Sequence, residues 1–266
     1  MLPLPHLDYN TDMDGIRSKL HISTIDSRAG ELASKNGLGV EIAEFCWAHY
    51  LDCGREEHMA AAREFARGAE SLWFHAPFAE ISPCAIDPKV RALTAERYRD
   101  SIRAAGELGI KRLVIHGGYI PYVYFPESFV AQSVLFWKEF LRDAPEDIRI
   151  ALENVMEPDP SMLVGIVREV DDERLGLCLD VGHANCETSD LAPEKWVRPM
   201  APRLFHVHLH DNIGGRDLHL PLGQGNVPFE TIINDVVSLA PEATFTIENM
   251  DAAPSVEALR AKGFLK

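Results

Sequence analysis

Residues 149–183 read RIALENVMEPDPSMLVGIVREVDDERLGLCLDVGH, and this stretch decides the fold. Apolar and β-branched runs at 149–155 and 175–181 indicate two strands. Between them, Asp159-Pro160 starts a helical pattern with apolar residues on one face. The stretch therefore predicts one strand–helix–strand unit, which implies that the two strands are parallel.

The same alternation continues in both directions along the chain. Strands are expected roughly every 33 residues, at 19–25, 39–45, 71–76, 112–117, 149–155, 175–181, 203–210 and 244–250. Helical patterns separate them, most clearly at 87–109, 128–144 and 229–239. Eight such units predict an α/β protein with a (β/α)8 TIM barrel in a single domain. An open doubly wound sheet is the alternative, but the chain has no Gly-rich fingerprint for it.

Length and composition agree with one barrel. The chain has 266 residues, of which 46% are apolar and 25% charged, and a single barrel needs about 250 residues. No linker divides it, so we expect one domain over residues 1–266, with residues 1–18 as an N-terminal extension. No apolar run approaches the roughly 20 residues that span a bilayer, and no signal peptide begins the chain. These features predict a cytoplasmic protein.

The net charge and the cysteine content limit the classes of binding partner and of metal site that are expected. A formal net charge of -15 disfavours nucleic acid and anionic membranes, although a local basic stripe can override the net field. The five cysteines are scattered and form no C-x-x-C pair, which argues against disulfides and a cysteine-type zinc site. The eleven histidines are more informative, because imidazole and carboxylate together bind metals.

Polar residues end six consecutive predicted strands, where the mouth of a barrel is formed. They are His75, His116, Glu153, Asp180 with His183, the series His206, His208 and His210, and Glu248; the loop after strand seven adds Asp217 and His219. Each alone is commonly a hydrogen-bonded core residue or half of an ion pair. Together, four carboxylates in one cavity repel unless cations neutralise them, and few basic residues lie nearby. The group therefore predicts a divalent metal site.

The seventh strand carries three histidines on one face, because Val207 and Leu209 alternate with them. His206 is expected to lie deepest, as a packed or supporting residue, whereas His208 and His210 lie nearer the mouth.

Two Glu-Asn pairs, 153–154 and 248–249, end strands that are three apart around the ring. This places two carboxylates on facing sides of a bound ligand, an arrangement that suits proton removal and return. Glu41 and Glu44 lie on opposite faces of the second predicted strand, because side chains alternate along a strand, so at most one of them faces the cavity. We expect that one to support the metal ligands without binding the metal.

From about residue 39 to 249, the chain resembles the xylose isomerase-like TIM-barrel superfamily, which includes sugar isomerases, sugar epimerases and the DNA repair enzyme endonuclease IV. The motifs that match endonuclease IV are His75 in His-Ala-Pro, His116 in His-x-Gly, Glu153 in Glu-Asn, Asp180 and His183 in Asp-x-x-His, His208 in His-x-x-Asp, Asp217 and His219 in Asp-x-His, and Glu248. This resemblance implies three zinc ions, held by the groups His75, His116 and Glu153; Glu153, Asp180, His208 and Glu248; and His183, Asp217 and His219.

The epimerase branch implies a smaller site. In that branch, one manganese-like ion is bound by the residues that match Glu153, Asp180, His208 and Glu248. The two glutamates are catalytic and exchange protons with a carbon beside a carbonyl. His183 then binds substrate. The chain departs from that branch in keeping Asp217 and His219, where epimerases place a substrate-binding arginine; Arg216 is adjacent but does not match.

The chain also departs from endonuclease IV. No basic run follows strand two, and Phe78 stands where the repair enzyme has a tyrosine that enters DNA. We expect Phe78 to line the cavity, and Tyr119 either to stack on a sugar or to pack in a lid. The candidate substrate-binding residues are His183, His210, Tyr119, Phe78 and Trp47.

The preferred function is a metal-dependent isomerase or epimerase that acts on a small sugar or sugar phosphate. The alternatives are an endonuclease IV-like phosphodiesterase and a metabolite-binding barrel without catalysis. The expected cofactor is zinc or manganese, with one to three ions per chain. Three divalent ions would give the site with its four carboxylates a net charge near +2, which favours a phosphate. One ion would give it a net charge near −2, which favours a neutral sugar. Substrate identity and a homo-oligomeric state stay open.

Overall fold

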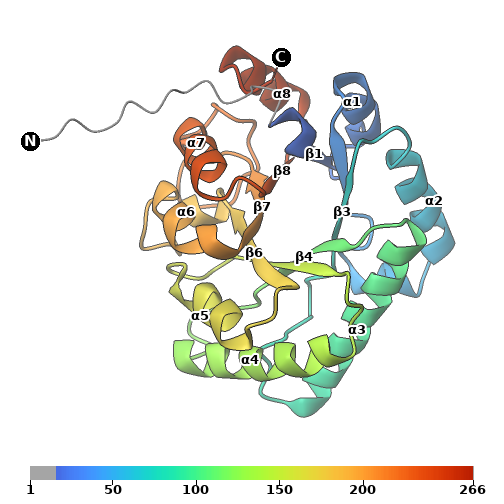
Figure 1. Cartoon of the computed structure of the whole chain (residues 1–266), viewed down its shortest axis with the longest axis vertical. Coiled ribbons are helices and arrows are strands. Elements are labelled where there is room, and N and C mark those ends of the chain that lie inside the picture. Colours follow the sequence, from blue (N-terminus) through green and yellow to red (C-terminus); the bar gives the residue numbers. More distant parts are fainter. Residues whose placement is uncertain (1–15, 266) are drawn as a thin grey trace, which may run out of the picture.

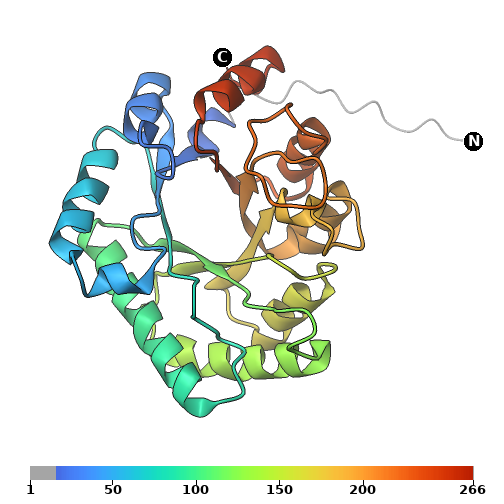
Figure 2. The same ribbon diagram turned by 180° about the vertical axis from the view of Figure 1, so that it is seen from behind.

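The computed structural model describes residues 16–265, and within them eight parallel strands form a closed barrel inside a ring of helices (Figures 1 and 2). The strands are β1 (Leu20–Ser23), β2 (Gly39–Ile42), β3 (Leu72–His75), β4 (Arg112–His116), β5 (Arg149–Glu153), β6 (Leu175–Asp180), β7 (Leu204–Leu209) and β8 (Thr244–Ile247). β1 pairs with β8, with Leu20 opposite Phe245, and this pairing closes the ring. The predicted (β/α)8 barrel is confirmed.

Each strand is followed by a helix that covers the outside of the barrel. The helices are α1 (Ala29–Asn36), α2 (Arg55–Phe65), α3 (Pro88–Glu107), α4 (Pro126–Arg142), α5 (Ser161–Val170), α6 (Glu194–Met200), α7 (Phe229–Leu239) and α8 (Ala253–Ala261). Short 3-10 turns lie at Arg17–Lys19, Ala48–Leu51, His183–Asn185 and Ala201–Arg203. Of the expected N-terminal extension, residues 1–15 lie outside the described residues. No helix in the range 16–265 is long and apolar enough to cross a membrane.

Local sequence explains where the helices begin. Asp87 caps α3 by accepting the Lys89 N–H at 2.7 Å, and Pro88 occupies the first turn. α4 starts at Pro126, two residues before the expected start, because proline suits the first turn of a helix and Phe125 is extended. α7 has the bounds that its apolar period predicts.

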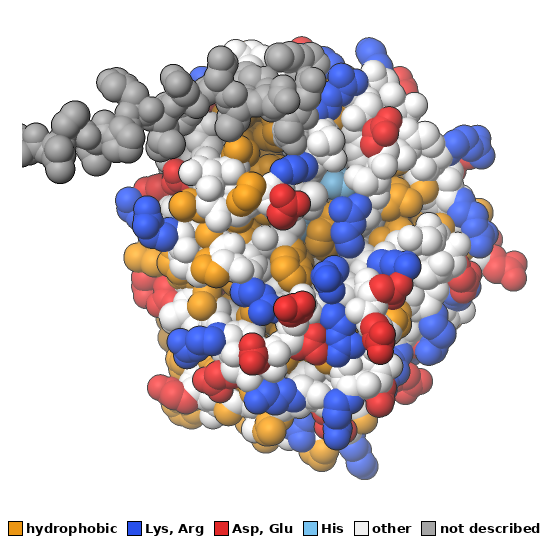
Figure 3. Space-filling model, in the orientation of Figure 1, with side chains coloured by type: hydrophobic (Ala, Val, Ile, Leu, Met, Phe, Trp, Pro, Cys, Tyr) orange, Lys and Arg blue, Asp and Glu red, His pale blue; other side chains and the backbone are white. Residues whose placement is uncertain are grey.

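The main apolar core lies between the strands and the helices, as in other barrels of this architecture. Tyr98 of α3 stacks on Trp137 of α4, with ring centroids 5.8 Å apart and an angle of 8° between the planes. Phe129, Trp137 and Leu141, which the helical period places inward, are all buried. On the face shown in Figure 3, basic and acidic side chains are interspersed.

The barrel interior is built in two layers by the period of two along each strand. An apolar layer comes first, formed by Trp73, Val114, Ala151 and Cys178. The residues two positions further along the same strands are His75, His116, Glu153 and Asp180. On β3 to β6 the pleat therefore raises these polar side chains together toward the carboxyl ends of the strands, above this apolar layer. On β2 and β7 the residues paired with Trp73 and Cys178 are the buried polar residues Glu41 and His206.

Candidate metal centre

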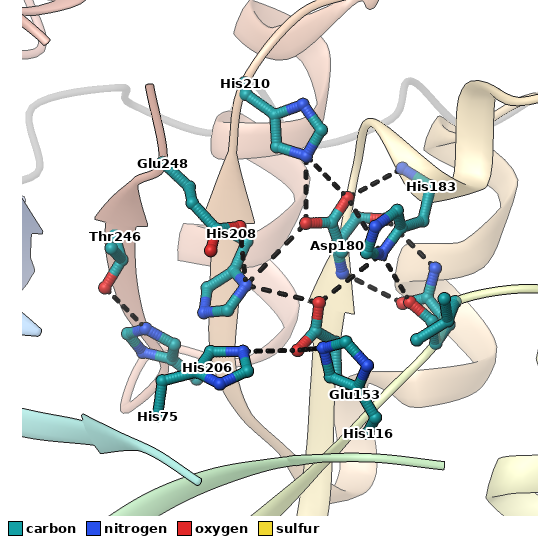
Figure 4. Close-up of polar contacts among 12 residues, drawn as sticks. His75, His116, Glu153, Asp180, His183, His206, His208, His210, Thr246 and Glu248 are labelled. Atoms are coloured by element: carbon teal, nitrogen blue, oxygen red, sulfur yellow. Dashed lines mark hydrogen bonds and ion pairs between the residues drawn. The ribbon is translucent and has the colours of Figure 1, made fainter. Parts of the chain in front are cut away.

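Glu153 lies at the centre of the polar layer and is only 1% exposed. Its Oε2 is 3.3 Å from His75 Nε2 and 3.4 Å from His116 Nε2, and its Oε1 is 3.4 Å from His208 Nδ1 (Figure 4). Burial raises the pKa of Glu153, but His116 and His208 outweigh that effect and hold this pKa well below its usual range. Glu153 is therefore an ionised carboxylate among imidazoles.

A second group surrounds Nδ1 of His208. This nitrogen lies 3.2 Å from Glu248 Oε2, 3.4 Å from Glu153 Oε1 and 3.7 Å from Asp180 Oδ2. The four side chains come from the ends of β5, β6, β7 and the segment directly after β8. Three carboxylate oxygens and one nitrogen thus converge within reach of a single cation.

A third group lies nearer the surface, where the loop between β7 and α7 meets the 3-10 turn after β6. Asp217 Oδ2 is 2.8 Å from His219 Nε2 and 3.3 Å from His183 Nε2. Burial lowers the pKa of His219, but its hydrogen bond to Asp217 raises this pKa to about 9. The nine residues that the sequence motifs single out as ligands are therefore brought together in three adjoining groups, two of which share Glu153.

Hydrogen bonds determine which nitrogen of each histidine faces the groups. Nδ1 of His75 donates to the carbonyl of Ala76. In the same way, Nδ1 of His183 donates to the carbonyl of Asn154 and Nδ1 of His219 to the carbonyl of Glu248, and the three distances are 2.8–2.9 Å. A carbonyl can only accept, so Nδ1 carries a proton, and Nε2 is the nitrogen that faces the carboxylates and would bind a metal once deprotonated. His208 is turned the other way: its Nε2 hydrogen-bonds to Glu41 Oε2 at 3.3 Å, and its Nδ1 faces the carboxylates.

The donor set fits a divalent cation. Glu153 Oε2 and His208 Nδ1 are buried without a hydrogen-bond partner among the described residues, and both point into the groups. A buried polar atom without a partner costs free energy, and so do carboxylates packed together. A divalent ion would satisfy these atoms, and oxygen and imidazole ligands suit zinc or manganese.

Two asparagines tie the ends of strands to neighbouring segments. Asn154 Nδ2 donates to the carbonyl of Asp180 at 3.0 Å, and Asn154 Oδ1 accepts the Asp180 N–H at 2.9 Å. Asn249 Nδ2 donates to the carbonyls of His219 and Leu220. β5 and β8 end earlier than expected, at Glu153 and Ile247, and these bonds hold the segments that follow them against the other groups of the site.

Asp211 was not singled out as a functional residue from sequence, yet it organises the loop that carries Asp217 and His219. Its carboxylate accepts the N–H groups of Gly223, Gly225 and Val227, each at 2.9 Å. A Cβ on Gly225 would lie 2.3 Å from Asp211 Oδ1, so only glycine fits there. The Asp in the His-x-x-Asp motif was the available signal.

Glu41 and His206 support His208 from below. His206 is fully buried, its Nε2 lies 3.0 Å from Glu41 Oε2, and its ring stacks on Trp73 at 4.2 Å. This matches the expected deep position of His206. Glu44 lines the cavity instead; it follows the end of β2, where strand alternation no longer applies.

A cavity of about 1020 Å³ opens above the groups, and its lining includes Trp47, Phe78, Tyr119 and His183. His210 is placed differently. It is fully buried, and its Nε2 lies 2.9 Å from Asp180 Oδ1. The backbone of Gly182 covers the ring, since a Cβ there would lie 1.9 Å from His210 Cε1. The expected contact of His210 with substrate does not fit this position, and the ring instead supports Asp180.

Comparisons with known proteins agree with this geometry. The model of the xylose isomerase-like TIM barrel family matches residues 32–263. An uncharacterized protein of Methanocaldococcus jannaschii is 30% identical over 82% of this chain and 76% of its own length. A probable endonuclease 4 of Mycobacterium marinum is 22% identical over 80% of this chain and 85% of its own length.

Two solved structures are similar over most of the chain. The crystal structure of a D-tagatose 3-epimerase-like protein has a TM-score of 0.75 and 28% identity, covering 92% of this chain and 96% of that one. A Thermus thermophilus protein soaked with zinc chloride has a TM-score of 0.73 and 27% identity, covering 91% and 97%. The superfamily members with stated activities are enzymes, namely epimerases and endonuclease IV. The closed barrel and the family match over residues 32–263 together show that this chain belongs to the xylose isomerase-like TIM barrel family.

Proposed function

We propose that this protein is a divalent-metal-dependent isomerase or epimerase that moves a proton beside the carbonyl of a small sugar. The observation that carries the proposal is the approach of two carboxylates to one imidazole nitrogen: Glu153 and Glu248 lie 3.4 and 3.2 Å from His208 Nδ1. Both glutamates also line the cavity, so a substrate there would lie within reach of each.

The two carboxylates have different surroundings. Glu153 is held by several imidazoles, whereas Glu248 is 9% exposed and has His208 as its imidazole partner. When bound, a divalent ion would polarise the substrate carbonyl and acidify the adjacent C–H. One glutamate then takes the proton and the other returns it, and return to the opposite face inverts that carbon. His183, on the cavity wall, orients a substrate oxygen.

Solvent exchange tests this proposal directly. Protein loaded with Mn²⁺ or Zn²⁺ is incubated in D₂O with a panel of ketoses and aldoses, and proton NMR follows the C–H signals beside the carbonyl. We expect deuterium incorporation together with a second sugar as product. Sugar binding without exchange would contradict the proposal and favour a barrel that only binds metabolites.

The contact between Glu41 and His208 leads to a prediction about the affinity of the protein for Zn²⁺. Glu41→Gln replaces the carboxylate beside His208 Nε2 by a neutral amide, which removes the negative charge that raises the basicity of Nδ1 as a metal ligand. We expect the affinity for Zn²⁺ to fall by about 10–100-fold, the usual effect of losing such a supporting carboxylate. Competition with a chromophoric chelator measures it.

Glu44→Gln is the matched control, because Glu44 accepts a hydrogen bond from Thr24 and contacts no ligand histidine. Its Zn²⁺ affinity should stay within about twofold of the unsubstituted protein. Equal losses in both variants would show that Glu41 does not act through His208.

Metal-dependent phosphoester hydrolysis is a second candidate, favoured by the preformed group of His183, Asp217 and His219. A mononuclear isomerase has no need of this group, whereas the endonuclease IV pattern places a third zinc there. Three zinc ions per chain in elemental analysis, together with cleavage of a duplex that contains an abasic site, would establish this candidate in place of the first.

A further inference from the structure

The cavity wall includes histidines but no permanently cationic side chain. Among the described residues that line it, none is lysine or arginine. Glu44 and Glu80 instead add two carboxyl groups to those of the metal groups. Arg216 precedes the ligand Asp217, but its side chain is exposed and does not line the cavity.

This distribution of charge selects against anions. Phosphoryl groups in proteins are commonly held by arginine, by lysine or by the amide groups at helix N-termini. With one divalent ion bound, the carboxylates of Glu153, Asp180, Asp217 and Glu248 still leave a net negative centre. A phosphoryl group elsewhere in the cavity would find no lysine or arginine among the described lining residues, which include Glu44 and Glu80.

Aromatic rings lead from the metal groups outward along one wall. Phe78 stacks on the ligand His116, with centroids 4.5 Å apart and an angle of 11° between the planes. Trp47 continues this surface, at 6.0 Å from Phe78, and is 55% exposed. A planar or apolar group placed against Trp47 and Phe78 would therefore adjoin the reaction centre.

The rest of the rim is apolar as well. Four further lining side chains are exposed, namely Ile120 (47%), Met156 (41%), Leu218 (43%) and Met250 (74%). They lie in the loops after β4, β5, β7 and β8, so several separate segments contribute them. Single exposed apolar residues are ordinary, but a group of them around one cavity marks a binding surface.

We propose that the cavity binds an uncharged keto sugar that bears an aromatic or other apolar substituent, such as an aryl glycoside whose ring carries a keto group; simple phenyl glycosides then serve as unreactive binding probes. The sugar lies at the metal groups, and the substituent lies against Trp47 and Phe78. The volume of about 1020 Å³ is at the upper end for small-molecule pockets and accommodates both parts. This inference rests on the proposed function, because it takes the sugar as the reacting part.

Calorimetric titration of the zinc-loaded protein tests the inference without any need for turnover. The probes are matched sets of phenyl glycoside, methyl glycoside and sugar 6-phosphate, built on glucose, galactose and mannose. In at least one set, the phenyl glycoside should bind at least 10-fold more tightly than the methyl glycoside, and no 6-phosphate should bind more tightly than its methyl glycoside. Failure of every phenyl glycoside to bind, equal affinities for phenyl and methyl glycosides, or preference for a 6-phosphate would each overturn it.

Variants assign the preference to the aromatic wall. Trp47→Ala should reduce the phenyl preference to about twofold, and because Trp47 is exposed this change leaves the core intact. Leu135→Ala is the control: Leu135 is 62% exposed on α4, outside the cavity, and its variant should keep the full preference.

The two proposals fail separately. A protein that prefers phenyl glycosides but catalyses no deuterium exchange keeps this binding site and loses the isomerase function. A protein that exchanges deuterium into sugar phosphates, with no phenyl preference, keeps the function and loses this inference.

Discussion

The Glu153→Gln variant is expected to lose at least about 10³-fold in kcat for the sugar reaction, because one change removes both a proton-transfer carboxylate and a metal ligand. Gln has the same shape, so the loss reports charge and proton affinity rather than packing. Deuterium exchange from D₂O measures the proton step, and elemental analysis of the same sample reports whether the metal is still bound. Loss of exchange with metal retained would assign the effect to proton transfer.

Glu157→Gln is the matched control, since it makes the same change in a buried residue of the same loop. The Glu157 carboxylate accepts the N–H groups of Val155 and Met156, and an amide oxygen can accept both. Burial raises the pKa of Glu157 to about 7, so a neutral side chain is readily accommodated there. This variant should keep kcat within about fivefold. A comparable loss in both variants would mean that any change in this loop disables the protein.

Removal of bound metal is expected to lower Tm by roughly 10 °C. Without a cation, Glu153, Asp180 and Glu248 remain buried beside one another, with only imidazoles to offset their charge. An ion present at 1,000 times its Kd stabilises the folded state by about 4.1 kcal/mol. For a chain of this size, 1 kcal/mol corresponds to about 2–4 °C. Differential scanning calorimetry of protein dialysed against chelator, and then reloaded with Zn²⁺ or Mn²⁺, measures the shift.

Two ligand variants locate the stabilising ion. Asp180→Asn alters the buried group around His208, and it should abolish most of the rise in Tm on reloading. Asp217→Asn alters only the outer group, and it should keep most of the rise if the inner ion provides the stability. An unchanged Tm after chelation and reloading of the unsubstituted protein would contradict a metal role in stability.

The barrel could be predicted from sequence because its signals are local. The apolar and β-branched runs mark eight strands. Between them, apolar residues at helical spacing predict helices, and α7 has the bounds that were predicted in this way. Strand ends were predicted less well. β5 and β8 end at Glu153 and Ile247, and the side chains of Asn154 and Asn249 beyond them bond to the backbone of other segments, which no local pattern reports.

The ligand groups were predictable for a related reason. His75 and Glu153 each follow an inward-facing apolar residue by two positions, so the pleat directs both to the same layer. His210 continues that alternation but lies beyond the end of β7, where the backbone of Gly182 covers it. Its position therefore depends on a neighbouring loop.

By itself, the sequence determined the number of strands, the closed parallel barrel and the rim at which carboxylates and imidazoles gather, since all three follow from periods of two and 3.6 residues. Only the tertiary structure decided which nitrogen of each histidine faces the centre, which carboxylate supports His208, and that the described cavity lining contains no lysine or arginine. These properties depend on contacts between segments far apart in the chain. The pair Glu41 and His208 is separated by 167 residues, and such contacts exist only once the barrel has closed.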